Sequence, residues 1–112
     1  MHKPDISWAD FAKLDIRTGT IESAVVFEKA RIPAYQLKVN FGEFGIKKTS
    51  AQITKRYLPA DLIGKQVLAI VNFPPKQIAN FMSECLILGA VNGDDVILIQ
   101  PDSETKNGLA VG

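Results

Sequence analysis

Apolar and polar side chains alternate without a break from Tyr35 to Phe41. Tyr35, Leu37, Val39 and Phe41 fall on one side of an extended chain, and the polar residues between them fall on the other. A period of two over this length predicts a β-strand with one face in a core and the other in water. These apolar residues are therefore the first candidates for the core.

The preceding segment, residues 14–28, has apolar residues whose parity changes along the chain. Ile16 is even-numbered, whereas Ile21, Val25 and Phe27 are odd-numbered. A bulge or bend near Gly19 would produce this change of the inward face. We therefore expect one long, curled strand with Ile21, Val25 and Phe27 directed inward.

Further strands are expected at residues 46–51, 66–73, 84–91 and 96–101. The second and third of these are almost continuously apolar, which is typical of buried strands. The sequence Asn-Gly-Asp-Asp at residues 92–95 has the composition of a turn before the last strand. Pro59 and Gly64 predict the start and the end of a short helix between the third and fourth strands.

A short helix is also expected near the N-terminus. Ser7 can cap it, and Asp10 completes a capping box. Trp8, Phe11 and Ala12 then share one face of the helix. That face needs a partner, either the barrel of this chain or that of a second copy.

The order of these elements predicts an all-β fold with short helices. Five strands, of which the first is curled, with a helix before the fourth form the arrangement of a five-stranded OB-fold β-barrel, here with an N-terminal helix and one or more extra C-terminal strands. Other small barrels fit the same pattern. The chain of 112 residues is 46% hydrophobic, which predicts a single domain over residues 1–112 with its core at about 14–100. A chain of this size leaves much surface uncovered, so pairing with a second copy is expected.

The connection between the strands at 66–73 and 84–91 is unusual. Pro74 and Pro75 fix the backbone and remove two hydrogen-bond donors, which predicts a rigid segment without ladder hydrogen bonds. Phe81 and Met82 follow, and both are expected at the surface. One interpretation is a preformed, partly apolar binding ledge, because methionine suits a promiscuous site. The other is that Phe81 and Met82 pack on the N-terminal helix or on a second copy.

Positive charge is concentrated in the middle of the chain, although the net charge is only +1. Residues 29–56 contain a single acidic residue, Glu43, and seven basic ones: Lys29, Arg31, Lys38, Lys47, Lys48, Lys55 and Arg56. Such a cluster at the mouth of a barrel can neutralise the phosphates of a nucleic acid, with Tyr57 as one candidate for base stacking. It can equally be a solvated face that keeps the protein in solution.

Signs of catalysis, metals and cofactors are missing from the sequence. Lys47 occupies the place where a phosphate-binding loop requires glycine, and the only histidine, His2, lies at the terminus. We expect no enzyme activity, no catalytic residue, no metal and no cofactor. Cys85, the only cysteine, is expected to be a small buried hydrophobe and not a reactive thiol. The absence of a signal peptide or membrane segment predicts a cytoplasmic protein without membrane insertion.

Several segments together resemble the CsaA chaperone family, a branch of the tRNA-binding-domain proteins that also occur attached to some methionyl- and phenylalanyl-tRNA synthetases. They are "FAKLDIRTGTI", "SAQITKRY", "VNFPPKQIANF" and "SECLILGAV", and the resemblance extends from about Phe11 to the final "NGLAVG". It implies an OB-fold barrel, a homodimer and an export-related chaperone that binds unfolded precursor proteins. Release without ATP is expected, because the chain has no nucleotide-binding motif.

The resemblance also assigns candidate residues to two kinds of ligand. The apolar ledge that would bind peptide consists of Phe73, Ile78, Phe81 and Met82. The basic rim that would bind nucleic acid, with Arg31 added from the charge cluster, consists of Arg31, Lys48, Ser50, Gln52, Lys55, Arg56, Lys76 and Ser83. Gln77 and Asn80 replace the basic residue and the glycine that related tRNA-binding modules favour. The alternative function is a tRNA-binding protein that uses the basic mouth, and a third is a structural dimer module.

Overall fold

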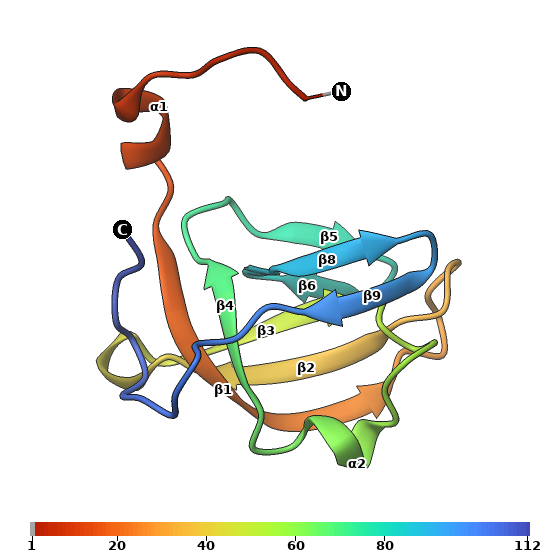
Figure 1. Cartoon of the computed structure of the whole chain (residues 1–112). Coiled ribbons are helices and arrows are strands. Elements are labelled where there is room, and N and C mark those ends of the chain that lie inside the picture. The colour runs from red at the N-terminus through yellow and green to blue at the C-terminus, as the bar shows by residue number, and fades with distance from the viewer. Residues whose placement is uncertain (1) are drawn as a thin grey trace.

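The structure is a computed structural model that describes residues 2–112, and it consists mainly of short strands (Figure 1). In chain order the elements are α1 (Trp8–Ala12), β1 (Ile16–Val26), β2 (Tyr35–Asn40), the 3-10 turn η1 (Gly42–Phe44), β3 (Ile46–Ala51), α2 (Pro59–Leu62), β4 (Gln66–Ile70), β5 (Lys76–Ile78), β6 (Phe81–Ser83), β7 (Leu86–Ile87), β8 (Gly89–Asn92) and β9 (Asp95–Leu98).

The main sheet has five antiparallel strands in the order β3-β2-β1-β4-β7. Figure 1 shows this sheet curling round into a nearly closed barrel, with α2 between β3 and β4 at one end. The predicted all-β OB-fold is thereby confirmed. Two hairpins, β5–β6 and β8–β9, are separate two-stranded sheets. The expected strand at residues 84–91 is divided between β7 and β8, because β7 pairs with β4 whereas β8 pairs with β9.

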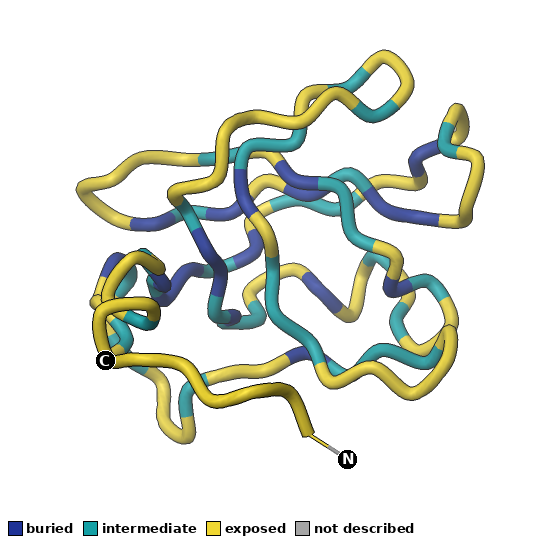
Figure 2. The backbone as a smooth tube through the Cα atoms, turned by 90° about the horizontal axis from the view of Figure 1, so that it is seen from above, coloured by how far each residue is buried: buried dark blue, intermediate teal, exposed yellow. Residues whose placement is uncertain are grey.

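The core lies inside this curled sheet, where Figure 2 shows the buried stretches of the chain. The predicted inward face of the alternating segment is confirmed, because Tyr35, Leu37, Val39 and Phe41 are all buried. Residues from other strands, from the end of α2 and from two connections complete the core: Ile21, Ile53, Leu62, Val67, Ala69, Cys85 and Leu98.

The first strand bends at a different place from the one predicted. The register between β1 and β2 shifts between Ile21 and Ser23, which leaves Glu22 as the extra residue of a bulge. Ala24 consequently packs on the core, whereas Val25 turns outward and is 54% exposed. The prediction that Val25 faces inward was wrong, because the extra residue of the bulge turns Ala24 towards the core in its place. The inward prediction is confirmed for Ile21 and Phe27, which are 0% and 3% exposed.

Helix α1 extends away from the barrel (Figure 1). Its capping box forms as expected: the Asp10 amide donates to Ser7 Oγ at 3.1 Å, and the Ser7 amide donates to the Asp10 carboxylate at 3.1 Å. No residue of the helix is buried, and Trp8 is 87% exposed. The expected contact with this chain's own barrel is therefore wrong for Trp8. Burial against a second copy stays a prediction.

The C-terminal segment returns to the first strand. Ala110 forms a single bridge with Arg17, and the Thr18 amide donates to the Leu109 carbonyl at 3.0 Å. The Gly108 amide donates to the Thr18 carbonyl at 2.7 Å. Among residues 2–112, no helix has the length and apolar character needed to cross a membrane.

Candidate binding site

The proline-containing connection folds into a hairpin. It was expected to lack ladder hydrogen bonds, but β5 and β6 pair antiparallel, with Ile78 opposite Phe81 and Gln77 opposite Met82. The prolines lie before the hairpin, outside its strands. Ala79, at the turn, has a positive φ of 52°. The prediction was wrong because three-residue strands are too short to show alternation in the sequence.

The two faces of this hairpin have different surroundings. Alternate residues of a strand point to opposite faces, so Lys76, Ile78 and Ser83 share one face, and Gln77 and Met82 share the other. Lys76, Ile78 and Ser83 line a pocket, and Met82 is not among the residues that line it. Met82 is exposed as predicted, but on the other face of the hairpin.

Phe81 attaches the hairpin to the barrel. Its ring meets the buried ring of Phe27 edge-on, with the ring centroids 5.4 Å apart. Lys48 Nζ lies over the Phe81 ring, 5.4 Å from its centroid. Phe81 is half-buried by these contacts and not freely exposed. Its partner within this chain is Phe27, which directly follows β1, and not the N-terminal helix; packing on a second copy stays a prediction.

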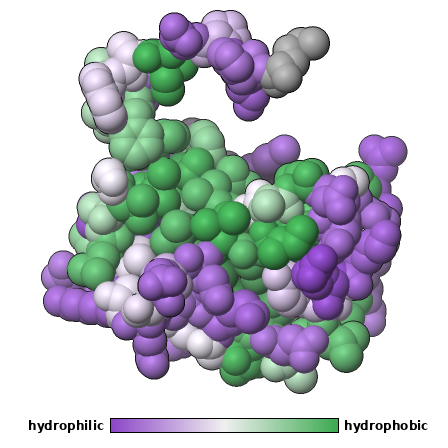
Figure 3. Space-filling view, viewed as in Figure 1, coloured by the Kyte–Doolittle hydropathy of each residue, from purple (hydrophilic) through white to green (hydrophobic). Residues whose placement is uncertain are grey.

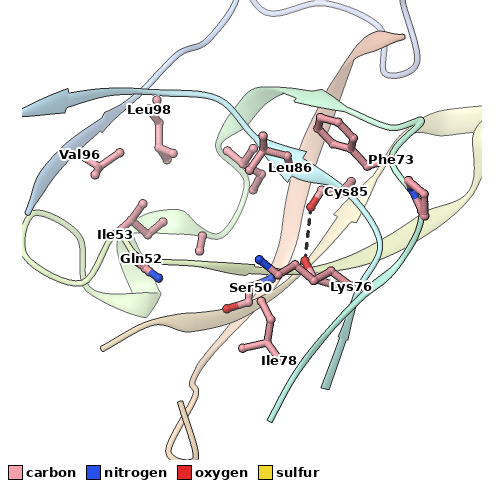
Figure 4. Close-up of a pocket in the computed structure, with 15 residues that line it drawn as sticks. Ser50, Gln52, Ile53, Phe73, Lys76, Ile78, Cys85, Leu86, Val96 and Leu98 are labelled. Atoms are coloured by element: carbon pink, nitrogen blue, oxygen red, sulfur yellow. Dashed lines mark hydrogen bonds between the residues drawn. The ribbon is translucent and has the colours of Figure 1, made fainter. Parts of the chain in front are cut away.

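The pocket has a volume of about 620 Å³ and opens between β3, the β5–β6 hairpin, β7 and the β8–β9 hairpin (Figure 4). In this view Ile53, Val96 and Leu98 lie at one end, and Ser50, Lys76 and Ile78 lie along one side. The full lining is Ser50, Ala51, Gln52, Ile53, Phe73, Pro74, Lys76, Ile78, Ser83, Cys85, Leu86, Ile87, Gly89, Val96 and Leu98. Figure 3 shows apolar surface across the middle of the molecule, bordered by hydrophilic residues.

Side-chain and backbone hydrogen bonds connect β3 with the segment that carries Ser83 and Cys85 of the pocket, and one of them runs from the Glu84 amide to the Lys48 carbonyl at 2.8 Å. Thr49 Oγ1 donates to the Cys85 carbonyl at 2.7 Å, and the Ser50 amide donates to Ser83 Oγ at 3.2 Å. The Lys48 amide donates to the Glu84 carboxylate at 2.8 Å. These bonds join the edge of β3 to the chain between β6 and β7. Because Ser83 Oγ already accepts a bond here, its first role is to hold the pocket together.

Cys85 is buried in the pocket wall, as predicted. Burial raises the pKa of its thiol to about 11, and the hydrogen bond with Thr49 only partly offsets this rise. The thiol is therefore protonated at neutral pH and has little reactivity. It acts as a small hydrophobe.

Two of the basic candidates form ion pairs. Lys55 Nζ lies 3.0 Å from the Asp94 carboxylate, and Arg56 binds both oxygens of Asp95 at 2.8 Å. The hydrogen bonds from Lys55 and Arg56 lower the pKa of Asp94 and of Asp95, respectively. The predicted turn at residues 92–95 is confirmed between β8 and β9, but the sequence did not predict these ion pairs.

The pocket combines residues from both predicted ligand classes. It contains Phe73 and Ile78 from the apolar ledge together with Ser50, Gln52, Lys76 and Ser83 from the basic rim. The other candidates lie outside its lining: Arg31, Lys48, Lys55, Arg56, Phe81 and Met82. Sequence reasoning missed Leu86, Ile87, Val96 and Leu98, because the apolar runs that contain them look like ordinary buried strands.

Comparison with known proteins gives the family. A model of the tRNA binding domain family matches residues 16–110. The chain belongs to this family. It is 36% identical over 107 residues to the methionine–tRNA ligase of Methanococcoides burtonii and 37% identical over 108 residues to that of Porphyromonas gingivalis strain W83. The matches cover 95% and 96% of this chain but only 16% of each ligase. The activity of the whole ligase is therefore not transferred to this chain.

Solved structures of similar length match more closely. The chaperone CsaA of Bacillus anthracis is 51% identical with a TM-score of 0.94, over 97% of this chain and all of that one. The CsaA chaperone protein of Picrophilus torridus is 50% identical with a TM-score of 0.91, over 96% of this chain and 100% of that one. The resemblance to the CsaA branch is thereby confirmed over nearly the full length.

Proposed function

We propose that this chain is a chaperone of the CsaA type that holds apolar segments of unfolded precursor proteins before their export from the cytoplasm. The observation that carries the proposal is the open apolar pocket of about 620 Å³. Its volume lies within the range of ligand sites, roughly 300–1,000 Å³. The likeness to two CsaA structures over their full length supports the same conclusion.

The residues of the pocket have complementary roles in this proposal. Phe73, Leu86 and Val96 bury the apolar side chains of a client. Gln52 and Lys76 can hydrogen-bond the client's main chain at the rim and so orient it. Binding by a few side chains is weak, and the client therefore leaves by simple dissociation without ATP. The chain works in this way as one domain, without catalysis.

A second copy of the chain completes the proposal. Ile6, Trp8 and Phe11 surround a shallow apolar hollow of about 270 Å³ on a helix that this barrel does not cover. Exposed tryptophan and isoleucine at one place are typical of an interface between proteins. A homodimer would cover them and would carry two client pockets.

The direct test is suppression of aggregation. A client unfolded in denaturant is diluted into buffer with increasing amounts of the protein, without nucleotide, and light scattering is followed. We expect suppression at near-stoichiometric amounts, together with binding of a labelled apolar peptide. If the protein neither reduces scattering nor binds the peptide, the chaperone proposal is wrong.

tRNA binding is the second candidate function. It is favoured by the family match and by two exposed lysines, Lys76 in the lining of the pocket and Lys48 outside it. Anisotropy of labelled bulk tRNA at several salt concentrations tests it, because each neutralised phosphate contributes about 0.7–0.9 to the log–log salt slope. A steep slope that falls when Lys48 or Lys76 is replaced by glutamine supports this function. A flat titration rejects it.

A further inference from the structure

We propose that Asp94 and Asp95 determine ligand specificity by keeping the segment from Lys55 to Tyr57 from binding nucleic acid phosphates. Their role would be to favour peptide over RNA at the mouth of the barrel. The inference rests on the proposed function, because it concerns which partner the same mouth accepts.

The β8–β9 hairpin binds three consecutive side chains of this segment. Lys55 pairs with Asp94 at the tip of the hairpin, at 3.0 Å. Arg56 forms two parallel hydrogen bonds with Asp95, each 2.8 Å long. The Leu98 amide donates to the Tyr57 hydroxyl at 3.1 Å. The two cations and the candidate stacking ring therefore all have partners on one hairpin.

Geometry and charge both disfavour phosphate here. The guanidinium fork of Arg56 is the group that would bind a phosphate through two bonds, and Asp95 occupies it. Exposed ion pairs are individually weak, so a phosphate could displace either carboxylate. The two carboxylates nevertheless neutralise the charge of the two cations, even when their side chains change rotamer and the hydrogen bonds break. This cancellation removes the long-range attraction that brings a polyanion to the surface.

The ion pairs lie close in sequence to pocket residues in both segments that carry them. Ile53 and Val96 line the pocket, and Figure 4 shows them at the same end of it. Arg56 follows Ile53 closely in sequence, and Asp95 directly precedes Val96. A nucleic acid that followed the rim towards this end would meet a neutral surface. An apolar peptide does not depend on that charge.

The test replaces both carboxylates by isosteric amides in the full chain, Asp94→Asn with Asp95→Asn. The matched control, Asp102→Asn with Glu104→Gln, changes the net charge equally, but in the C-terminal segment, which Figure 1 places away from the β8–β9 turn. Labelled bulk tRNA and a labelled apolar peptide are titrated by anisotropy at 50–200 mM salt. Circular dichroism checks the fold, and Asp94→Asn alone serves as a milder variant.

We expect the first double variant to bind tRNA more tightly and to steepen its log–log salt slope by about 1.4–1.8, because two further phosphates are neutralised. The ratio of its tRNA affinity to that of the unmodified protein should therefore be about ten times larger at 50 mM than at 200 mM salt. This factor is the change in slope applied to a fourfold change in salt concentration. The control should change the slope by much less. Adding Lys55→Gln and Arg56→Gln to the first variant should return the slope to that of the unmodified protein.

Equal slopes for the first variant and the unmodified protein, or equal effects of the two double variants, would overturn the inference. A failure of the chaperone proposal gives a different result, because the unmodified protein would then not bind the apolar peptide. Peptide binding that persists unchanged in the first variant, with tRNA binding increased, supports both proposals.

Discussion

Replacing Phe73 by serine tests whether the pocket binds the client. Phe73 lines the pocket and is 49% exposed, so about half of its side chain is available to a ligand. Burial of a whole phenylalanine side chain contributes about 1.5–3 kcal/mol. Covering the exposed half therefore contributes about 0.8–1.5 kcal/mol. We expect Phe73→Ser to weaken binding of an apolar peptide about four- to twelvefold.

Met82→Ser is the matched control for this experiment. Met82 is 42% exposed, close to the value for Phe73, but it lies on the face of the β5–β6 hairpin that does not line the pocket. The assay is a titration of a fluorescent, unstructured apolar peptide of about ten residues, followed by anisotropy. The reasoning is refuted if Met82→Ser weakens binding as much as Phe73→Ser, or if Phe73→Ser leaves the affinity unchanged.

Further predictions concern packing, chemistry and assembly. A Cβ atom at Gly19 would lie 2.7 Å from Val39 Cγ1 in the core, so Gly19→Ala should destabilise the protein by about 1–3 kcal/mol; an unchanged melting temperature would contradict this close packing. Because burial raises the pKa of the Cys85 thiol to about 11, a thiol reagent at pH 8 should label it at least roughly a hundred times more slowly than a free cysteine, and labelling should accelerate in denaturant. Labelling at the rate of a free thiol would show that the wall of the pocket opens. Trp8→Ser should shift the protein from dimer towards monomer in analytical ultracentrifugation. If the unmodified protein is itself a monomer, the prediction that a second copy buries α1 is wrong.

Strict alternation made the core of the barrel predictable. The inward positions of Tyr35, Leu37 and Val39 follow from a period of two, and burial of those positions is confirmed. The position of Val25 did not follow, because a single bulge at Glu22 turns Ala24 towards the core in its place. A bulge leaves no clear mark in the sequence of one chain.

The binding site was only partly predictable, for a different reason. Phe73, Ile78 and Lys76 were identified because they lie in one unusual segment around two prolines. The ion pairs of Lys55 and Arg56 join residues 39 positions apart in the chain, and only the folded barrel brings them together. The basic cluster therefore looked more available to phosphate in the sequence than it is in the structure.

Mapping a bound peptide by NMR would test the central claim most directly. A ¹⁵N-labelled sample is titrated with the unlabelled apolar peptide, and amide shifts are followed. We predict that the changes concentrate at residues of the pocket, such as Gln52, Lys76, Ile87 and Gly89. Changes confined to Met82 and its neighbours, to helix α1 or to Lys55 and Arg56 would contradict the account, as would the absence of any change.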